Sequence, residues 1–377
     1  MPDGKQTVVV TGVAGNLGLR LLPHLAGYNV IGLDIKPPVA DAPLSFEKVD
    51  LGREASCGQL VELLRRSKAV AVVHLAFVID PVRTGVLQND HMWQINVAGT
   101  ARVMEAITEV NRNYGGRVQK FIFPSSVSAY GSDLAFPATE STPLGGHTLP
   151  YAVHKREADE VVQYRTSKLG SCSTYILRPH IYAGATMQNY LIGALRGTPT
   201  GRGKIAQRWR EKGVRLPLVV PLGERYERNL FQFVHVDDVA RLIAYILYQP
   251  ETTARTMILN VAGRGQPITF GRCAEIAHQK VIRVPSAAAC RMILSALWKL
   301  GISGMPPEAL PYVIGSYTMD TSRLRAFLGS EYEHVIRYTS EDALRDCFTP
   351  SHPDEHLPDS QDNEPAPQNT TVFGPTQ

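Results

Sequence analysis

The sequence predicts an α/β fold, a doubly wound parallel sheet with a smaller lobe towards the C-terminus. Short apolar, β-branched segments alternate with segments of helical periodicity through the first half of the chain. Such alternation is typical of a parallel sheet that helices cover on both faces. After Arg178 the remaining helices are separated by Pro/Gly-rich or basic loops, which predicts the smaller lobe. With 377 residues and 44% apolar content, the chain can form one large or two modest domains.

Six segments have the character of buried strands, namely 7–11, 29–33, 70–75, 118–123, 174–178 and 257–261. Helical periodicity is found at 15–26, 59–68, 90–114 and from Leu149 onward, and again at about 236–248, 270–280, 288–300 and 340–347. We assign 1–180 to the sheet domain, to which a strand near 257–262 returns, and 181–348 mainly to a substrate-binding lobe. Ligands of doubly wound sheets bind at the carboxyl ends of the strands, so substrate is expected between the lobes.

The C-terminal tail differs in composition from the rest of the chain. Residues 349–377 are rich in Pro, Asp, Asn and Gln and carry five acids but no Lys or Arg. Because the tail has few large apolar residues, it is predicted to be disordered. The net charge of +4 therefore leaves about +9 on the remainder of the chain.

A glycine turn follows the first predicted strand. In "TVVVTGVAGNLG", Gly12, Gly15 and Gly18 are placed for a tight turn, for close approach of a pyrophosphate, and for packing of the first helix on the strand. Asp34 ends the second strand, where a carboxylate can accept hydrogen bonds from an adenosine ribose and would repel a 2′-phosphate. These features predict a dinucleotide site that favours NAD over NADP, with Lys36 nearby as the feature that would suit NADP.

Tyr151 and Lys155 lie one helical turn apart in "LPYAVHKREADEVVQY" and therefore share a helix face. Taken alone, this pair is also common on solvated helices. Further motifs accompany it in a fixed order: "VDL" at 49–51, "HLA" at 74–76, "INVAGT" at 95–100, "FIFPSSVSAYG" before the pair, "LRPHIYAG" at 177–184, "FVHVDDVA" at 233–240 and "LNVAG" at 259–263. With the glycine turn, they make residues 5 to 345 resemble the extended short-chain dehydrogenase/reductases, the NAD-dependent epimerase/dehydratase group.

The resemblance implies an NAD-binding Rossmann domain at 1–180 and a set of site residues. Ser126 would hydrogen-bond the reacting oxygen, Tyr151 would be the acid/base, and Lys155 would hold the nicotinamide ribose. Residues implied to contact or support the cofactor are Gly12, Gly15, Asn16, Leu17, Gly18, Asp34, Asp50, Leu51, His74, Leu75, Ala76, Asn96, Tyr151, Lys155 and Pro179. A lysine and the positive nicotinamide ring would both lower the pKa of the tyrosine, as base catalysis near neutral pH requires.

Departures from the family pattern restrict the reaction. The sugar-nucleotide 4,6-dehydratases carry an Asp-Glu pair where this chain has Val127 and Ser128, and related decarboxylases and 3,5-epimerase/4-reductases also differ there. What remains is 4-epimerisation, or simple dehydrogenation and reduction. Nucleotide-sugar epimerases commonly have a diphosphate-binding arginine at the position of Phe231, for which the nearby Arg228 is a candidate substitute. His180 is expected either to contact substrate or to pack.

Three functions are therefore compared. The first is an NAD-dependent epimerase of a nucleotide-linked sugar. The second is a dehydrogenase or reductase of an alcohol or ketone, including an apolar or steroid-like one, which Phe231 and the apolar segment 287–302 would favour. The third is a cofactor-sensing protein without turnover, against which Ser126, Tyr151 and Lys155 argue. The basic segment 196–215 is expected to be a loop that either binds an anionic group or is simply solvated.

Other features exclude several classes. Five scattered cysteines without ligand spacing predict free thiols and no metal site. No membrane span is expected, and the N-terminal residues pass directly into a predicted strand without a signal-peptide pattern, which favours a cytoplasmic location. The basic segment lacks interleaved aromatic residues beyond Trp209, so nucleic acid is not an expected partner. The resemblance implies a homodimer through the helices that begin near Asp90 and Leu149.

Overall fold

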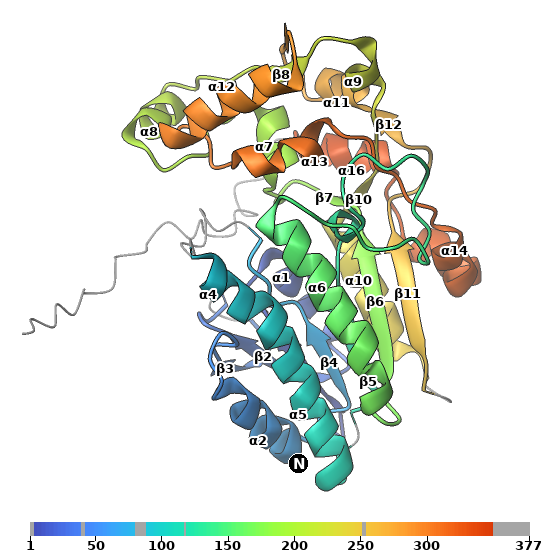
Figure 1. Ribbon diagram of the computed structural model, residues 1–377. Helices are drawn as coiled ribbons and strands as arrows, with labels where there is room; N and C mark the ends of the chain where they lie inside the picture. Colours follow the sequence, from blue (N-terminus) through green and yellow to red (C-terminus); the bar gives the residue numbers. More distant parts are fainter. Residues whose placement is uncertain (1–3, 39–41, 80–87, 117, 251–253, 350–377) are drawn as a thin grey trace, which may run out of the picture.

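A computed structural model gives the fold and describes residues 4–38, 42–79, 88–116, 118–250 and 254–349 (Figure 1). Its centre is a seven-stranded sheet with the order β11-β6-β5-β4-β1-β2-β3, in which every neighbouring pair is parallel. The strands are β1 (Thr7–Thr11), β2 (Asn29–Asp34), β3 (Ser45–Lys48), β4 (Ala71–His74), β5 (Lys120–Pro124), β6 (Ser173–Pro179) and β11 (Thr256–Val261). The predicted doubly wound parallel sheet is confirmed.

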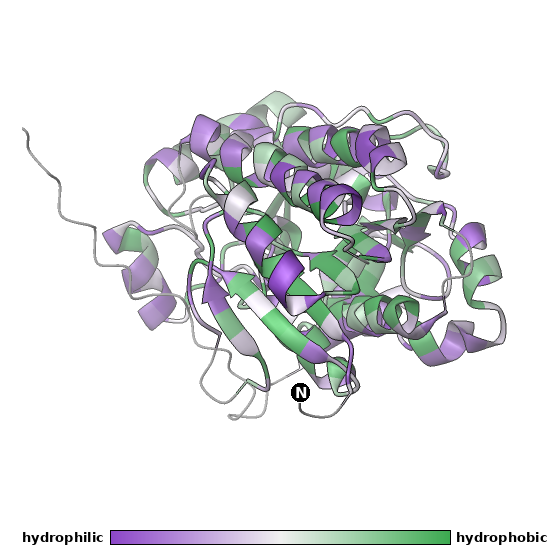
Figure 2. Ribbon diagram, turned by 90° about the horizontal axis from the view of Figure 1, so that it is seen from below, coloured by the Kyte–Doolittle hydropathy of each residue, from purple (hydrophilic) through white to green (hydrophobic). Residues whose placement is uncertain are grey.

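Side chains alternate between the two faces of this sheet, as the period of a strand dictates. In β1, Val8 and Val10 face one apolar core, whereas Val9 faces the other. The first core lies under α1 (Asn16–Leu21) and α10 (Val236–Tyr248), and the second under α2 (Ser56–Ser67), α5 (Gly99–Asn113) and α6 (Pro150–Arg165). Figure 2 shows the strands mainly in the apolar colour between helices of mixed character.

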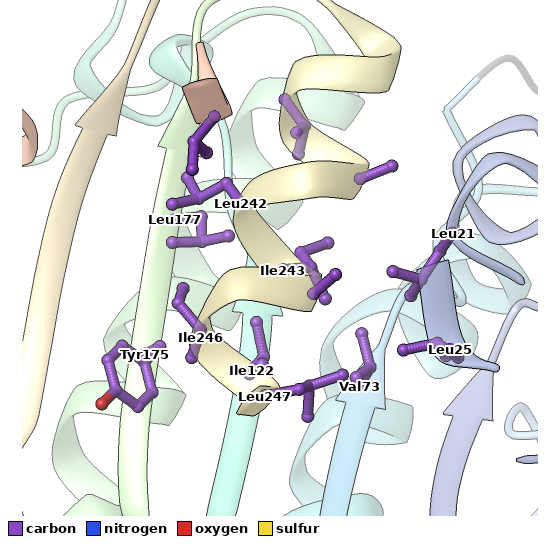
Figure 3. Close-up of a cluster of buried hydrophobic side chains, with 14 of the residues drawn as sticks. Leu21, Leu25, Val73, Ile122, Tyr175, Leu177, Leu242, Ile243, Ile246 and Leu247 are labelled. Carbon is purple, nitrogen blue, oxygen red and sulfur yellow. The ribbon is translucent and has the colours of Figure 1, made fainter. Parts of the chain in front are cut away.

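Helix α10 belongs to the packing of the sheet, although it falls in the range that we assigned mainly to the smaller lobe. Figure 3 shows Leu242 and Ile246 of α10 beside Ile122 on β5 and Leu177 on β6. All four side chains are fully buried. The contacts of α10 with α1 complete the layer on this face.

The smaller lobe is built from short helices and two-stranded ladders around a third core that contains Phe231, Phe233 and Phe270. Its helices include α7 (Tyr190–Arg196), α8 (Lys204–Glu211), α9 (Glu224–Arg228), α11 (Phe270–Ile276), α12 (Ala287–Lys299), α13 (Leu310–Ile314) and α16 (Ser340–Asp346). The ladders pair β7 (Ile181–Ala183) with β10 (Phe233–His235), β8 (Leu218–Pro221) with β13 (Val281–Val284), and β9 (Leu230–Phe231) with β12 (Ile268–Thr269). Figure 1 draws the lobe beyond the carboxyl ends of the sheet strands.

Three local features differ from the sequence prediction. Strand β3 was not predicted, and the basic segment expected to be a loop contains α8. The helix predicted at 90–114 is divided into α4 (Asn89–Trp93), a π-helical turn at Gln94–Ala98, and α5. Among the described residues, no helix has the length and apolar character needed to cross a membrane.

Candidate active site

Two glycines fix the turn after β1. Gly12 has a φ of +69°, and its N–H donates to the carbonyl of Leu33 at 2.7 Å, which ties the turn to β2. A Cβ on Gly12 would lie 2.5 Å from the amide nitrogen of Ala76, and one on Gly18 would lie 2.4 Å from the carbonyl oxygen of Val13. Backbone cannot move aside for either atom, so both positions require glycine.

Gly15, which lies between these two glycines, is less crowded. A Cβ on Gly15 would meet only the carbonyl oxygen of Gly12 within 4 Å, at 3.2 Å, so Gly15 is less crowded than Gly12 and Gly18. This is the cradle that a pyrophosphate would use. Asp34 is joined to the same turn, because its carboxylate accepts from the N–H of Ala14 at 3.1 Å. It also accepts from the N–H of Ile35 at 2.7 Å. Burial raises the pKa of Asp34, while these backbone hydrogen bonds act in the opposite direction.

Other implied cofactor residues shape the surrounding chain. Asp50 accepts from the N–H of Gly52 at 2.9 Å and forms the turn after β3, beside the buried Leu51. The side-chain amide of Asn16 donates to the carbonyl of Thr186 at 3.1 Å and so connects α1 to the smaller lobe. Leu17 and Leu75 pack partly buried against the first core, and Pro179 ends β6.

His74 lies inside the sheet rather than on the surface of the cleft. Its Nδ1 is 2.7 Å from the hydroxyl of Thr11, and its Nε2 is 3.0 Å from that of Thr100. Because Thr100 donates its proton to the carbonyl of Asn96, it must accept from Nε2, and Nδ1 then accepts from Thr11. Burial lowers the pKa of His74 to about 3, so the ring is neutral. His74 therefore joins β1, β4 and α5 and can serve the cofactor only by holding the backbone beside it.

Asn96 holds the backbone that follows β4. It lies in the π-helical turn, and its side-chain amide makes both hydrogen bonds to Val78, accepting from the N–H at 2.7 Å and donating to the carbonyl at 3.0 Å. The paired contacts fix the segment that carries Phe77. A π-helical turn at this place is typical of a functional site, because it re-aims one side chain within a helix.

Three hydroxyl groups meet at the start of α6. Tyr151 lies in the first turn of this helix, and its phenol group lies close to the hydroxyls of Ser126 and Ser128. Ser126 Oγ accepts from the backbone N–H of Ser128 at 3.1 Å and from its hydroxyl at 2.8 Å. Since a hydroxyl has two acceptor sites and one proton, Ser126 is left to donate outward, towards Tyr151 or a substrate oxygen. Burial raises the pKa of Tyr151, and both serine contacts oppose that rise.

Lys155 lies under the Tyr151 ring with its ammonium group away from solvent. Its Nζ donates to the carbonyl of Pro124 at 2.7 Å and is 5.9 Å from the centre of the Tyr151 ring. Phe77 covers the group, with its ring centre 3.6 Å from Nζ. The Phe77 and Tyr151 rings are perpendicular to each other, with their centres 5.9 Å apart. Burial lowers the pKa of Lys155 to about 7. Phe77 is a site residue that the sequence analysis did not find.

A buried ion pair fixes α6 to the sheet. Arg178 of β6 donates to both carboxylate oxygens of Asp159 at 2.9 Å, and a third hydrogen bond reaches the hydroxyl of Tyr130 at 2.8 Å. Arg178 and Asp159 are almost completely buried, so this bidentate pair has a single geometry. It positions the helix face that carries Tyr151 and Lys155.

The motif after β6 contributes Tyr182 rather than His180 to the site. His180 is buried, its Nε2 contacts the carbonyl of Tyr317 at 2.8 Å, its Nδ1 accepts from Ile181 N–H, and its pKa is lowered by burial to about 4. His180 therefore packs inside the protein, which is one of the two roles expected from the sequence. The hydroxyl of Tyr182, by contrast, is buried and has no hydrogen-bond partner among the described residues, as is also true of Ser125 Oγ. Burial raises the pKa of Tyr182, and the nearby Tyr151 phenol raises it further.

The basic side chains that the sequence suggested as substrate ligands have other contacts in the structure. Arg228 is at the exposed end of α9, paired with Glu224 at 2.8 Å, in a surface hollow that it shares with Glu227 and Arg283. Phe231 is fully buried against Phe270. In the basic segment, Arg196, Arg210 and Arg215 donate to backbone carbonyls of the smaller lobe, so these three cations are part of its folding.

The sequence model of the NAD dependent epimerase/dehydratase family matches residues 8–262, more than half of the chain. The chain belongs to this family. The description of the family names NAD, which agrees with the cofactor expected from Asp34. An uncharacterized epimerase/dehydratase of Staphylococcus aureus (strain MRSA252) is 24% identical over 167 residues, which are 43% of this chain and 49% of that protein. The chain thus spans about half the length of the curated relatives that it matches.

Solved structures of the same family share the fold over nearly the whole chain. The UDP-glucose 4-epimerase of Thermus thermophilus in complex with NAD has a TM-score of 0.61 at 20% identity and covers 90% of this chain and 97% of its own. The dTDP-glucose 4,6-dehydratase of Bacillus anthracis in complex with NAD has a TM-score of 0.62 at 17% identity and covers 91% and 95%. At these identities the likeness establishes the fold.

The residues present fit NAD. The turn offers an open cradle at Gly15 between two positions where a Cβ is impossible, and Asp34 lies at the end of β2. Ser125 and Tyr182 supply buried hydroxyls without protein partners among the described residues. Within the described ranges, no group of three or more His, Cys, Asp or Glu side chains comes together that could hold a metal ion.

Proposed function

We propose that the protein is an NAD-dependent epimerase of a nucleotide-linked sugar, with Tyr151 as the acid and base. The observation that carries this proposal is the cluster of Ser126, Ser128 and Tyr151 hydroxyls over the buried Lys155. The Thermus thermophilus neighbour is a UDP-glucose 4-epimerase, which supports a nucleotide sugar as the substrate class.

In this proposal Tyr151 accepts the proton of a sugar hydroxyl while the C–H bond of the same carbon breaks, which leaves a carbonyl. NAD, when bound, would supply a reversible acceptor for the hydride, and return of the hydride to the opposite face of the carbonyl would give the epimer. Ser126 donates to the sugar oxygen, because Ser128 occupies both acceptor sites of Ser126. Tyr151 then returns the proton. Gly12, Gly15 and Asp34 would hold the adenosine diphosphate end, and Lys155 the nicotinamide ribose.

The same residues argue against elimination of water. A dehydratase needs a second acid and base next to the sugar, beyond the tyrosine. Val127 is an apolar, buried side chain, and the Ser128 hydroxyl is already donated to Ser126. Neither can titrate near neutral pH, so the chemistry should stop at transfer of hydride and proton.

A net dehydrogenase or reductase is the second candidate, and Phe231 favours it. The position where nucleotide-sugar epimerases commonly carry a diphosphate-binding arginine is an apolar side chain with no exposure. An alcohol or ketone without a diphosphate would need no cation there. The two reactions share Tyr151 and Ser126, and they differ in whether the hydride returns to the substrate.

We also propose that the protein is a cytoplasmic homodimer that pairs through α5 and α6. These helices lie side by side on one face of the sheet. Tyr114, directly after α5, is 54% exposed, and Tyr164, near the end of α6, is 73% exposed. Sedimentation equilibrium would test the dimer.

The test of the proposed function is to purify the protein without added cofactor, denature it, and count the dinucleotide released. An epimerase returns its hydride to the same substrate and gains by retaining NAD, so close to one NAD(H) per chain supports the proposal. The loaded protein would then be incubated with UDP-sugars and the products identified by mass spectrometry and chromatography. An empty protein that reduces added NAD in proportion to product would instead identify a dehydrogenase.

A further inference from the structure

The outward face of α12 is apolar. The helix buries Cys290 and Leu294 on its inner side, against Leu310. On the opposite side the exposed residues recur every fourth position, namely Ala288, Met292, Ala296 and Leu300, the last directly after the helix. Met292 is 69% exposed and Leu300 58% exposed, and Trp298 and Ile293 flank them at 42% and 37%. A helix on the surface of a protein normally presents polar residues on the side away from the core.

Basic side chains accompany this apolar face. Lys299 lies within the face, and Arg291 lies on its edge. Helix α8 is attached to the end of α12 by two backbone hydrogen bonds, from Gly203 N–H to the Gly301 carbonyl at 2.8 Å and from Gly201 N–H to the Ile302 carbonyl at 2.9 Å. Figure 1 draws α8 and α12 together at the end of the molecule opposite α2.

Helix α8 also exposes both basic and apolar side chains. It exposes Lys204, Arg208 and the apolar Ile205, which is 43% exposed. Segments 196–222 and 285–305, which contain α8 and α12, carry nine Lys and Arg against one acid, Glu211. Although Arg196, Arg210 and Arg215 are engaged with carbonyls, they still add to the positive field of this end.

We propose that this α8/α12 face docks the enzyme on the surface of an anionic lipid bilayer. Met292, Ile293 and Leu300 would enter the region between headgroups and acyl chains. Lys204, Arg208 and Lys299 would meet lipid phosphates, since long basic side chains can bury their stems while their charges stay at the interface. Trp298, at the border, is the residue type that prefers this depth.

Charge and apolarity together select this occupant over two others. A second copy of the chain would bring the same positive surface against itself, which is unfavourable. The acidic segment 349–377 complements the charge but contains few large apolar residues that could cover Met292 and Leu300. An anionic bilayer supplies both an apolar layer and negative phosphates.

Docking would bring the substrate side of the enzyme near the membrane. Met305, which follows α12, packs against the cluster formed by Leu149, Ala152, Ala309 and Tyr312, and Tyr151 packs against the same cluster. The lobe that carries the α8/α12 face is therefore the lobe that contacts the start of α6. The inference does not rest on the proposed reaction, because binding is measured without substrate.

Co-sedimentation with lipid vesicles tests this membrane docking. One set of vesicles contains phosphatidylcholine alone, and the other contains phosphatidylcholine mixed with the anionic phosphatidylglycerol. The intact chain should bind the anionic vesicles and lose binding as salt is raised. Lys204→Glu/Arg208→Glu should weaken the partition coefficient at least about twentyfold, because each basic residue near an anionic surface contributes a factor of about five. Met292→Glu/Leu300→Glu should reduce it at least about tenfold.

Matched controls remove an exposed apolar or basic residue outside the face. Phe136→Glu, at a residue that is 82% exposed, and Lys168→Glu should bind as the parent protein does. The proposal is overturned by absence of binding at low salt, or by equal binding of the parent and all variants to neutral vesicles. It is also overturned if Met292→Glu/Leu300→Glu changes only the oligomeric state in sedimentation, since the face would then join two copies. Circular dichroism checks that each variant is folded, and the two double variants test the face independently.

Discussion

Replacing Lys155 by methionine should make the protein more stable while it abolishes turnover. The Lys155 side chain is 5% exposed, and burial lowers its pKa from 10.5 to about 7. At 1.36 kcal/mol per pKa unit, keeping the ammonium in this place costs about 5 kcal/mol. Methionine has a similar length and no charge, so that cost disappears.

Two contacts reduce the gain. The variant loses the hydrogen bond to the Pro124 carbonyl, 2.7 Å long in the native protein, and the contact of Nζ with the Phe77 ring at 3.6 Å. A charged hydrogen bond and a partly desolvated cation–π contact together contribute about 3 kcal/mol. The net expectation for Lys155→Met is a free energy of unfolding about 2 kcal/mol higher than that of the native protein near neutral pH.

The difference in the free energy of unfolding between Lys155→Met and the native protein should decrease as pH rises above about 7. Above the folded pKa of about 7 the native lysine has lost its proton, while the unfolded lysine keeps it until about 10.5. Because the unfolded state then binds more protons, the native protein becomes more stable as pH rises, by up to about 1.4 kcal/mol per pH unit. The advantage of Lys155→Met should therefore shrink between about pH 7 and pH 9. Below that window it should be constant.

Urea unfolding of both proteins at the two pH values measures this double difference, in which other titrating groups cancel. Lys48→Met, at an exposed position on the edge strand β3, shows what the loss of an unburied lysine does. The reasoning about the site would be refuted if Lys155→Met were less stable than the native protein with a difference that does not change with pH. That result would mean that the ammonium is well compensated where it lies.

Four further substitutions test other parts of the site. Tyr151→Phe should lower kcat by a factor of about 100 to 10,000 while NAD binding, measured by calorimetry, persists. Gly12→Ala should abolish NAD binding in equilibrium dialysis, since a Cβ would lie 2.5 Å from the Ala76 nitrogen. Tyr182→Phe should lower kcat/KM about tenfold without lowering Tm, because it removes a hydroxyl without a protein partner among the described residues; an unchanged kcat/KM would assign that hydroxyl no role. Arg228→Ala should leave KM for a UDP-sugar unchanged, and a large rise would place this exposed arginine in the substrate site.

The parts of the fold that could be predicted are those with a continuous apolar signal. Six of the seven strands have such a signal because they are buried on both faces. The seventh, β3, has the sequence SFEK, and none of its four residues is buried, so it carries no apolar signal. The basic segment was expected to be a loop because of its glycines and charges, whereas residues 204–211 of it form α8.

The site was predictable where a motif carries the chemistry and not where packing does. Tyr151, Lys155 and Ser126 lie together as their motifs imply. Phe77 and Tyr182 are ordinary aromatic residues in sequence. Only the fold places the Phe77 ring over the Lys155 ammonium and leaves the buried Tyr182 hydroxyl without a protein partner among the described residues. His180 was a candidate substrate residue because histidine can act as an acid or a base, whereas the fold buries it against the Tyr317 carbonyl.

The most direct test of the central claim uses a UDP-sugar carrying deuterium at the carbon whose hydroxyl Tyr151 would deprotonate. The account predicts that the epimer forms with the deuterium retained at that carbon, without net accumulation of reduced cofactor, and that Tyr151→Phe forms almost none. Appearance of a ketone, with the deuterium recovered in released reduced cofactor in equal amount, would contradict it and identify a net dehydrogenase.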